Sequence, residues 1–235
     1  MLHSTKLNSR LPDLFFFLVG TPKSGTTWLS LMLDTHPEIW CKGEAHLFDA
    51  WPFDIYSAFK NLWINHEKEY PRWSYFEIEE NDVSQMYRLC TDFYLLKGFS
   101  SSRKRICGDK SPGTEGFIER IDLLYPEAKI IHLIRDGRDV TVSWCHFFHP
   151  NSPLTEQIVI ECAERWVASV SKAVEFEKTR TNYLITRYES LLQTPHEELS
   201  KVLSFLGADI SDFIIQNPGF LLNNFFLQFF FLSFV

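Results

Sequence analysis

The stretch "FFFLVGTPKSGTTWLSLML", residues 15–33, combines residue types that suit anion binding. A short apolar run leads into a loop bounded by Gly20 and Gly25, and an apolar helical pattern follows. Glycines let a backbone approach an anion closely, the first amides of a helix attract negative charge, and Lys23 adds a mobile cation. In a nucleoside-triphosphate loop the lysine directly follows the second glycine, whereas here Thr26 does. The loop therefore predicts a phosphate-like ligand other than the tail of ATP.

A second candidate anion site lies in "IRDGRDVTVSWCHF". An apolar run over residues 129–134 delivers Arg135, and Ser143 follows eight residues later on an expected helix. An arginine fork with a hydroxyl suits a phosphate, and an ATPase would instead carry an acidic magnesium ligand at this strand end. Two anion sites without a metal ligand predict a ligand phosphorylated at two places. The alternative is a surface ion pair of Arg135 with Asp136 or Asp139.

The elements that must position these residues alternate between strand and helix. Strands are expected at 15–19, 105–107, 129–134 and 183–188, and helices at 26–34, 47–62, 82–97, 115–124, 138–147, 155–178 and 195–205. This alternation predicts an α/β fold in which a central, mostly parallel sheet is flanked by helices. Ligands gather at the carboxyl ends of such strands, so the loops after Val19, Cys107, Ile134 and Arg187 should share one edge.

Composition narrows the function classes. The 235 residues are 45% hydrophobic and 23% charged, which is ordinary globular usage, and the net charge of -7 argues against a nucleic-acid partner. The five cysteines contain no C-x-x-C pair, which favours a reducing compartment and gives no zinc pattern. The polar N-terminus lacks a signal-peptide layout, and no membrane span is expected. The predicted location is cytoplasmic, with the Golgi as the alternative if the N-terminus is incomplete.

Three segments are expected along the chain: a polar stretch at 1–14, one domain at 15–217 and an apolar tail at 218–235. The tail reads "PGFLLNNFFLQFFFLSFV". It is interpreted either as a buried terminal segment or as an altered or truncated C-terminus.

The two anion motifs resemble those of sulfotransferases that use 3′-phosphoadenylyl sulfate (PAPS). "TPKSGTTW" is similar to their 5′-phosphosulfate loop, and "IRDGRDVTVS" is similar to their 3′-phosphate motif. The resemblance implies a three-layer P-loop-like fold and PAPS as co-substrate. It implies these donor-binding residues: Lys23, Ser24, Gly25, Thr26, Thr27, Trp28, Arg135, Ser143 and Tyr188. Among them Trp28 matches a residue that stacks on adenine; the alternative is that Trp28 and Tyr188 only pack in the interior.

Two further segments, "KGEAHLFD" and "GDKSPGT", resemble the heparan-sulfate and tyrosylprotein branches and their bacterial relatives more than the cytosolic phenol enzymes. The resemblance makes Glu44 the general base, Lys23 the partner of the leaving oxygen and Lys110 an aid at the sulfuryl oxygens. The alternative for Glu44 is a cap on a helix beginning near Leu47. The implied acceptor is a hydroxyl of a carbohydrate, a tyrosine or a small molecule, ahead of an amine, and no metal is required.

The sequence departs from the family pattern after Lys201, where no lysine or arginine follows. Family members usually close a basic loop over the 3′-phosphate, and the loss of one such contact would cost about 2–3 kcal/mol. Because of this departure, a catalytically impaired nucleotide-binding or interaction protein is an alternative function. The glycine loop makes a nucleoside-phosphate kinase a further alternative.

The redox state of the cysteines also has an alternative. If the loops that carry Cys41 and Cys107 meet, the two could form a disulfide instead of staying reduced.

Overall fold

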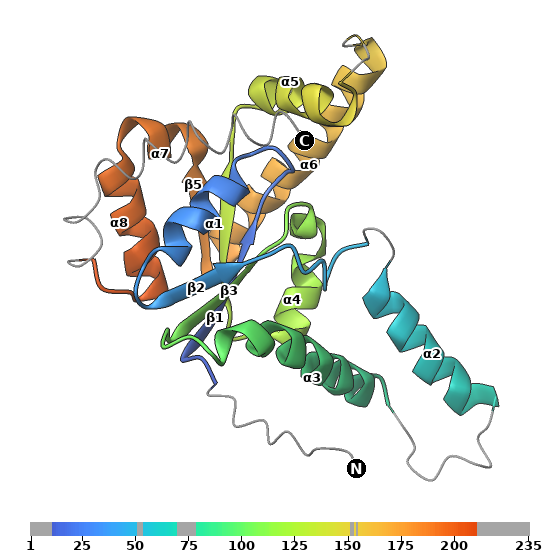
Figure 1. Cartoon of the computed structure of the whole chain (residues 1–235). Coiled ribbons are helices and arrows are strands. Elements are labelled where there is room, and N and C mark those ends of the chain that lie inside the picture. Colours follow the sequence, from blue (N-terminus) through green and yellow to red (C-terminus); the bar gives the residue numbers. More distant parts are fainter. Residues whose placement is uncertain (1–10, 51–53, 70–78, 151–152, 154, 211–235) are drawn as a thin grey trace.

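A five-stranded parallel sheet forms the centre of the computed structural model, which describes residues 11–50, 54–69, 79–150, 153 and 155–210 (Figure 1). The sheet order is β2-β3-β1-β4-β5, and every neighbouring pair is parallel. The strands are β1 (Leu14–Val19), β2 (Ile39–Lys42), β3 (Ile106–Lys110), β4 (Lys129–Ile134) and β5 (Tyr183–Arg187). The predicted fold class is therefore confirmed.

Helices cover both faces of this sheet (Figure 1). One face packs against α3 (Glu80–Phe99), α4 (Ile118–Leu124) and α6 (Glu156–Thr179), and α2 (Ile55–Glu69) packs against α3. The other packs against α1 (Thr26–Asp34), α7 (Tyr188–Gln193) and α8 (Pro195–Leu206). The remaining helical segments are a 3₁₀ turn, η1 (Thr114–Phe117), and α5 (Gly137–Phe148).

The sequence of β1 explains why both faces are buried. Side chains alternate across a strand, so Phe15 and Phe17 enter one core cluster while Phe16 and Leu18 enter the other. All four side chains are at most 7% exposed. A strand that is apolar on both sides belongs in the middle of a covered parallel sheet, and β1 lies in that position.

Some predicted boundaries were wrong. Strand β2 was not predicted, β3 runs on to Lys110 rather than ending at Cys107, and α7 begins at Tyr188, where a strand was expected. Helix α2 begins at Ile55 instead of near Leu47. Glu44 therefore does not cap a helix, and Lys110 is the last residue of a strand.

Cys41 and Cys107 lie on neighbouring strands but on opposite faces of the sheet. Cys107 pairs in register with Trp40, and Cys41 pairs with Gly108, so the two thiols are out of phase. Each is buried in a different core cluster, and both are free. The disulfide alternative is therefore wrong.

Within the described residues no helix is long and apolar enough to cross a membrane. The apolar segment 218–235, for which two interpretations were given, lies outside the described residues.

Candidate active site at the carboxyl edge of the sheet

The loops that follow the strands bring the predicted residues to one edge. Glu44 lies beyond β2, Lys110 ends β3, Lys23 follows β1, and Arg135 follows β4 directly. Tyr188 comes directly after β5. Because all five strands are parallel, their carboxyl ends share this edge, as predicted for ligand-binding loops.

The loop after β1 is an open anion cradle. Gly20 and Gly25 have φ angles of +151° and +96°, and Gly25 occupies the N-cap position of α1 without any side-chain cap. A Cβ at Gly20 would lie 2.4 Å from the Leu133 carbonyl oxygen, and one at Gly25 would lie 2.6 Å from the Tyr188 ring. Ser24 is buried and its amide donates to the Thr21 carbonyl, which tightens the turn. The first-turn amides of α1 therefore keep their donors for a ligand.

Lys23 lies at the top of this loop with a φ angle of +77°. Its Nζ sits 3.8 Å from the centre of the Phe147 ring on α5. Burial lowers the pKa of Lys23, the charge of Arg135 lowers it further, and Glu44 opposes the shift. The ammonium group is thus electrostatically coupled to both of the other charged residues predicted for the site.

Arg135 faces the same loop. Its Nη1 donates to the Lys23 carbonyl at 3.3 Å, and its guanidinium carbon lies 4.6 Å from the centre of the Tyr188 ring. The Trp28 ring packs edge-on against Tyr188 with centroids 5.4 Å apart. Trp28 is half-buried and Tyr188 is buried, so both rings also contribute to the core, and the Tyr188 ring lies beside the charged group of Arg135.

One nitrogen of Arg135 remains without a partner. Its Nε is buried and has no hydrogen-bond partner among the residues that the structure describes. Nη2 approaches Asp139 at 3.7 Å, which is a loose contact with a largely exposed carboxylate. The half-buried Ser143 lies one helical turn beyond Asp139 on α5, so it shares that face. An arginine with an unmet donor next to a half-buried hydroxyl suits an anionic ligand better than a surface ion pair.

Glu44 and Lys110 form an ion pair on the other side of the anion cradle. Lys110 Nζ lies 2.5 Å from Glu44 Oε1 and donates to the Thr27 hydroxyl at 3.1 Å. The Lys110 side chain is 8% exposed, whereas that of Glu44 is 43% exposed. Burial would raise the pKa of Glu44, but the hydrogen bond and charge of Lys110, together with His46, hold it below its usual value. Glu44 is therefore ionised near neutral pH, as a proton acceptor must be.

Two residues outside the predicted set of site residues, His46 and Asp49, lie beside Glu44 and orient it. His46 Nε2 lies 3.4 Å from Glu44 Oε2, and His46 Nδ1 lies 2.7 Å from Asp49 Oδ2. Thr114 donates its hydroxyl to the same Asp49 oxygen at 3.1 Å. An imidazole held between two carboxylates has a fixed ring orientation. The three-residue spacing of His46 and Asp49 in "EAHLFD" was visible in the sequence, but no helix or strand was predicted that would turn both inward.

A buried carboxyl lies directly before Lys110. Asp109 accepts from the Ser111 hydroxyl at 2.6 Å, and that hydroxyl accepts from the His46 amide at 3.3 Å. Burial raises the pKa of Asp109 to about 6, against the opposing effects of Ser111, the Ala45 amide and Lys110. Through Ser111, β3 holds the loop that carries Glu44 in place.

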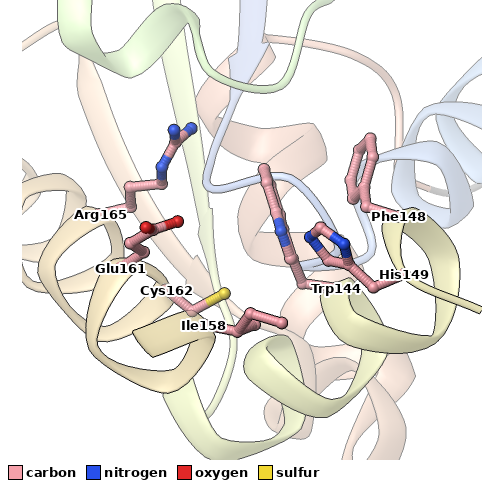
Figure 2. Close-up of a pocket in the computed structure, with 7 residues that line it drawn as sticks. All are labelled: Trp144, Phe148, His149, Ile158, Glu161, Cys162 and Arg165. Carbon is pink, nitrogen blue, oxygen red and sulfur yellow. The ribbon is translucent and has the colours of Figure 1, made fainter. Parts of the chain in front are cut away.

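A cavity of about 320 Å³ lies between α5 and α6 (Figure 2). Trp144 and Phe148 of α5 face Ile158, Cys162 and Arg165 of α6 across it. Phe148 also packs against Phe147, the ring that holds the Lys23 ammonium group, with centroids 4.9 Å apart. The aromatic residues of the cavity wall are thus in contact, through Phe147, with Lys23 of the anion cradle.

The nine predicted donor-binding residues therefore lie on the loop after β1, at the ends of β4 and β5, or on α1 and α5. A ligand with two anionic groups and an aromatic ring fits these residues. The α1 amides and Lys23 can bind one anion, Arg135 can bind the other, and the Trp28 and Tyr188 rings can pack against the aromatic part. No group of three or more histidine, cysteine, aspartate or glutamate side chains arranged to hold a metal occurs in the described parts of the chain.

Comparison with known proteins identifies relatives of this chain. A family model described as "Sulfotransferase family" matches residues 16–212. Protein-tyrosine sulfotransferase A of Caenorhabditis elegans is 26% identical over 218 residues, covering 86% of this chain and 52% of the relative. The protein-tyrosine sulfotransferase of Drosophila melanogaster is 25% identical over 228 residues, covering 91% of this chain and 42% of the relative. The chain thus spans about half the length of these relatives.

Solved structures share the fold. The sulfotransferase domain of the Synechococcus PCC 7002 olefin synthase superposes with a TM-score of 0.59 at 20% identity, covering 91% of this chain and 84% of that one. Mouse sulfotransferase SULT7A1, solved as a complex with PAP, gives a TM-score of 0.51 at 20% identity, covering 85% and 60% respectively.

Proposed function

Because this chain belongs to the sulfotransferase family, we propose that it transfers a sulfuryl group from PAPS to an acceptor hydroxyl. The observation that carries the proposal is the convergence of Lys23, Arg135, Glu44 and Lys110 at one sheet edge, with Lys23 electrostatically coupled to Arg135 and Glu44. The described residues fit the donor on two counts: the cradle at Gly25 has no room for a side chain, and Arg135 has an unmet buried donor.

The donor binds with its two anionic ends on neighbouring strands. The 5′-phosphosulfate lies on the first-turn amides of α1, with the Thr26 and Thr27 hydroxyls and Lys23 nearby. The 3′-phosphate pairs with Arg135, supported by Ser143, and the adenine packs beside Trp28 and Tyr188. β1 and β4 are adjacent in the sheet, so their spacing sets the distance between the two binding loops.

In the transfer step, an acceptor oxygen forms a bond to sulfur while the bond from sulfur to the bridging phosphate oxygen breaks. Glu44 takes the proton of the attacking hydroxyl, and Lys23 stabilises the charge that develops on the leaving oxygen. Lys110 donates to the transferred sulfuryl oxygens once it exchanges its contact with Glu44 for one with the substrate. Release from Lys110 also raises the pKa of Glu44, which makes it a stronger base at the moment of transfer.

The acceptor is a tyrosine-like phenol in this proposal. The protein-tyrosine sulfotransferases among the relatives support a tyrosine hydroxyl. The cavity near Phe147 supports the same class, because Trp144 and Phe148 offer aromatic faces to a phenol ring, with Glu161 and Arg165 as polar lining residues. Carbohydrate and small-molecule hydroxyls are the competing classes.

The test has two stages on the full chain. Calorimetric titration with adenosine 3′,5′-bisphosphate is expected to give saturable binding, with ATP plus magnesium binding at least tenfold more weakly. Incubation with radiolabelled PAPS is then expected to label a tyrosine-containing peptide but not its phenylalanine counterpart. Folded protein that gives no saturable heat with the bisphosphate would refute the donor assignment, and labelling of carbohydrate alone would refute the acceptor class.

The interaction-protein alternative makes a different prediction in the same assay. A catalytically impaired binding module would bind the bisphosphate and label no acceptor. The kinase alternative has no support from the comparisons that place this chain in the sulfotransferase family.

A further inference from the structure

Helix α3 carries a stripe of apolar side chains on the side opposite its buried residues. Leu89 is 69% exposed and Phe93 is 57% exposed, which is unusual for side chains of this size. Cys90 is exposed and Met86 is half-buried. At 3.6 residues per turn these four residues, the α3 stripe, lie within about a third of the helix circumference. Rings of α2 contact α3 through Tyr87, which lies outside this sector.

The α3 stripe has a charge of opposite sign at each end. Asp82 lies in the first turn of α3 and Lys97 in the last turn, and both side chains are exposed. Both positions fall in the same sector of the helix as the stripe. Within the described residues neither side chain takes part in an ion pair, unlike Arg88, which pairs with Asp92 on the same helix. The stripe is therefore apolar in its middle, acidic at one end and basic at the other.

This pattern is complementary to itself in an antiparallel pair of helices. A twofold axis midway between positions 89 and 90 would place a second copy of α3 in the reverse direction. Every residue of the stripe and of its ends then lies opposite another of the set: Asp82 opposite Lys97, Met86 opposite Phe93, and Leu89 opposite Cys90. Apolar side chains thus meet apolar ones, and a carboxylate meets an ammonium group at both ends of the pair.

The charges also select the direction and the partner. A parallel pair would put Asp82 against Asp82 and Lys97 against Lys97, whereas the antiparallel pair opposes unlike charges and aligns the helix dipoles favourably. A contact of this kind, made by the same surface on both copies, is the usual geometry of twofold dimers. One helix pair lies at the low end of the interface sizes known for specific complexes, so the expected dissociation constant is in the micromolar range.

We propose that the α3 stripe is a dimerisation surface, and that its partner is the α3 stripe of a second copy of this chain in antiparallel orientation. The inference goes beyond the proposed function and does not depend on it, because α3 carries none of the residues assigned to the donor, the proton acceptor or the leaving oxygen.

The first experiment reverses the charges at the two ends of the stripe. Sedimentation equilibrium of the full chain measures the dissociation constant of the dimer. Lys97→Glu alone and Asp82→Lys alone each bring like charges together at both ends of the pair, so each should weaken the dimer at least tenfold. An equimolar mixture of the two variants has unlike charges at both ends and should form a mixed dimer within threefold of the wild-type affinity. Lys178→Glu, at an exposed position in the last turn of α6, is the matched control and should behave as wild type.

The second experiment uses Cys90 as a chemical probe. The other four cysteines of the chain are buried, so a thiol reagent should react with Cys90 alone in the folded protein. Since Cys90 lies next to the twofold axis, a short bis-maleimide should join two wild-type chains and should not join Cys90→Ser chains. Leu89→Gln is expected to lower the yield of joined chains at least fivefold. Leu123→Gln, at an exposed leucine of α4, should give the wild-type yield.

Three results would overturn the inference. Wild-type chain that stays monomeric at concentrations of several hundred micromolar has no such dimer. A dimer that is equally stable in Lys97→Glu and Leu89→Gln is formed by another surface. Failure of Cys90 to react with a simple maleimide in the folded wild type would show that another segment covers the stripe. Lys97→Glu and Leu89→Gln leave the helix cap intact, so they decide the question if Asp82→Lys does not fold.

Discussion

At the scale of single residues, the site pairs each reactive group with a partner that restrains it. Lys110 holds Glu44, Phe147 holds the ammonium group of Lys23, and Tyr188 lies under Arg135. These contacts describe the site without a ligand. A bound nucleotide would change them, because the cationic groups of Lys110, Lys23 and Arg135 would turn from these partners towards the ligand. In the proposed reaction, transfer would therefore be coupled to an exchange of these contacts within the protein.

Glu44→Gln tests the proton acceptor. An amide cannot take a proton, so turnover should fall by roughly 10²- to 10⁴-fold while affinity for adenosine 3′,5′-bisphosphate stays within threefold. Transfer of radiolabel and calorimetry measure the two quantities separately. Glu197→Gln, an exposed carboxylate in the first turn of α8, is the matched control and should behave as wild type. Full turnover in Glu44→Gln would remove Glu44 from the mechanism.

At the scale of elements, the strand–loop–helix unit of β1 and α1 makes the anion site by backbone shape. Gly25 has a left-handed backbone and lies against the Tyr188 ring, so this one residue links the loop to the aromatic side of the site. A side chain here would push Tyr188 away from Arg135, which itself contacts the Lys23 carbonyl. The loop and the β5–α7 junction are thus mutually dependent.

Gly25→Ala is expected to lower affinity for the bisphosphate at least tenfold, because the new Cβ would lie 2.6 Å from the Tyr188 ring. Gly113→Ala separates this clash from backbone strain: Gly113 has a similar φ angle of +94°, but a Cβ there meets nothing within 4 Å. Both variants should lose about 1 kcal/mol of stability from the positive φ. Equal affinities in the two variants would contradict the role assigned to Tyr188.

The sequence predicted the residues of the site better than the elements that carry them. Glycine and lysine spacing in the first loop and an arginine after a buried strand are local signals, and the structure brings the loop and Arg135 together at the predicted edge of the sheet. Anion binding by these residues stays a prediction. β2 was missed because "IWCK" is only four residues long. The expected strand at 105–107 stopped short of Gly108, Asp109 and Lys110, which are residue types that are uncommon in strands. His46 and Asp49 lie close to Glu44 in the sequence, but their contacts with Ser111 and Thr114 join distant segments, which no local pattern encodes.

At the scale of the whole molecule, the two core clusters enclose several polar groups besides the site. His132 is fully buried in the middle of β4, and burial lowers its pKa to about 3 from an ordinary value of 6.5. The unfolded chain therefore binds a proton more readily than the folded one in this range. Its contribution to stability is complete above pH 6.5 and is lost progressively as the pH falls towards 3.

His132→Gln should make stability less sensitive to acid. Between pH 6.5 and about pH 5 the wild type is expected to lose about 2 kcal/mol more of its free energy of unfolding than the variant does. Urea unfolding at the two pH values measures this difference. Asp109 acts in the opposite direction, because its pKa is raised to about 6, so the comparison must be made between variants rather than from the wild-type curve alone. Identical pH dependence in both proteins would show that His132 does not titrate on unfolding.

The order of the strands divides the site into two halves with separate duties. β1, β4 and β5 carry the residues assigned to the nucleotide, whereas β2 and β3 carry Glu44 and Lys110. In the proposed reaction, mutations near β2 and β3 would therefore change the acceptor specificity and the rate, while the affinity for the sulfuryl donor would stay the same. An engineer seeking a new specificity would diversify the segments next to Glu44. The loop after β1, α5 and the β5–α7 junction would be kept constant, because they carry Lys23, Ser143 and Tyr188.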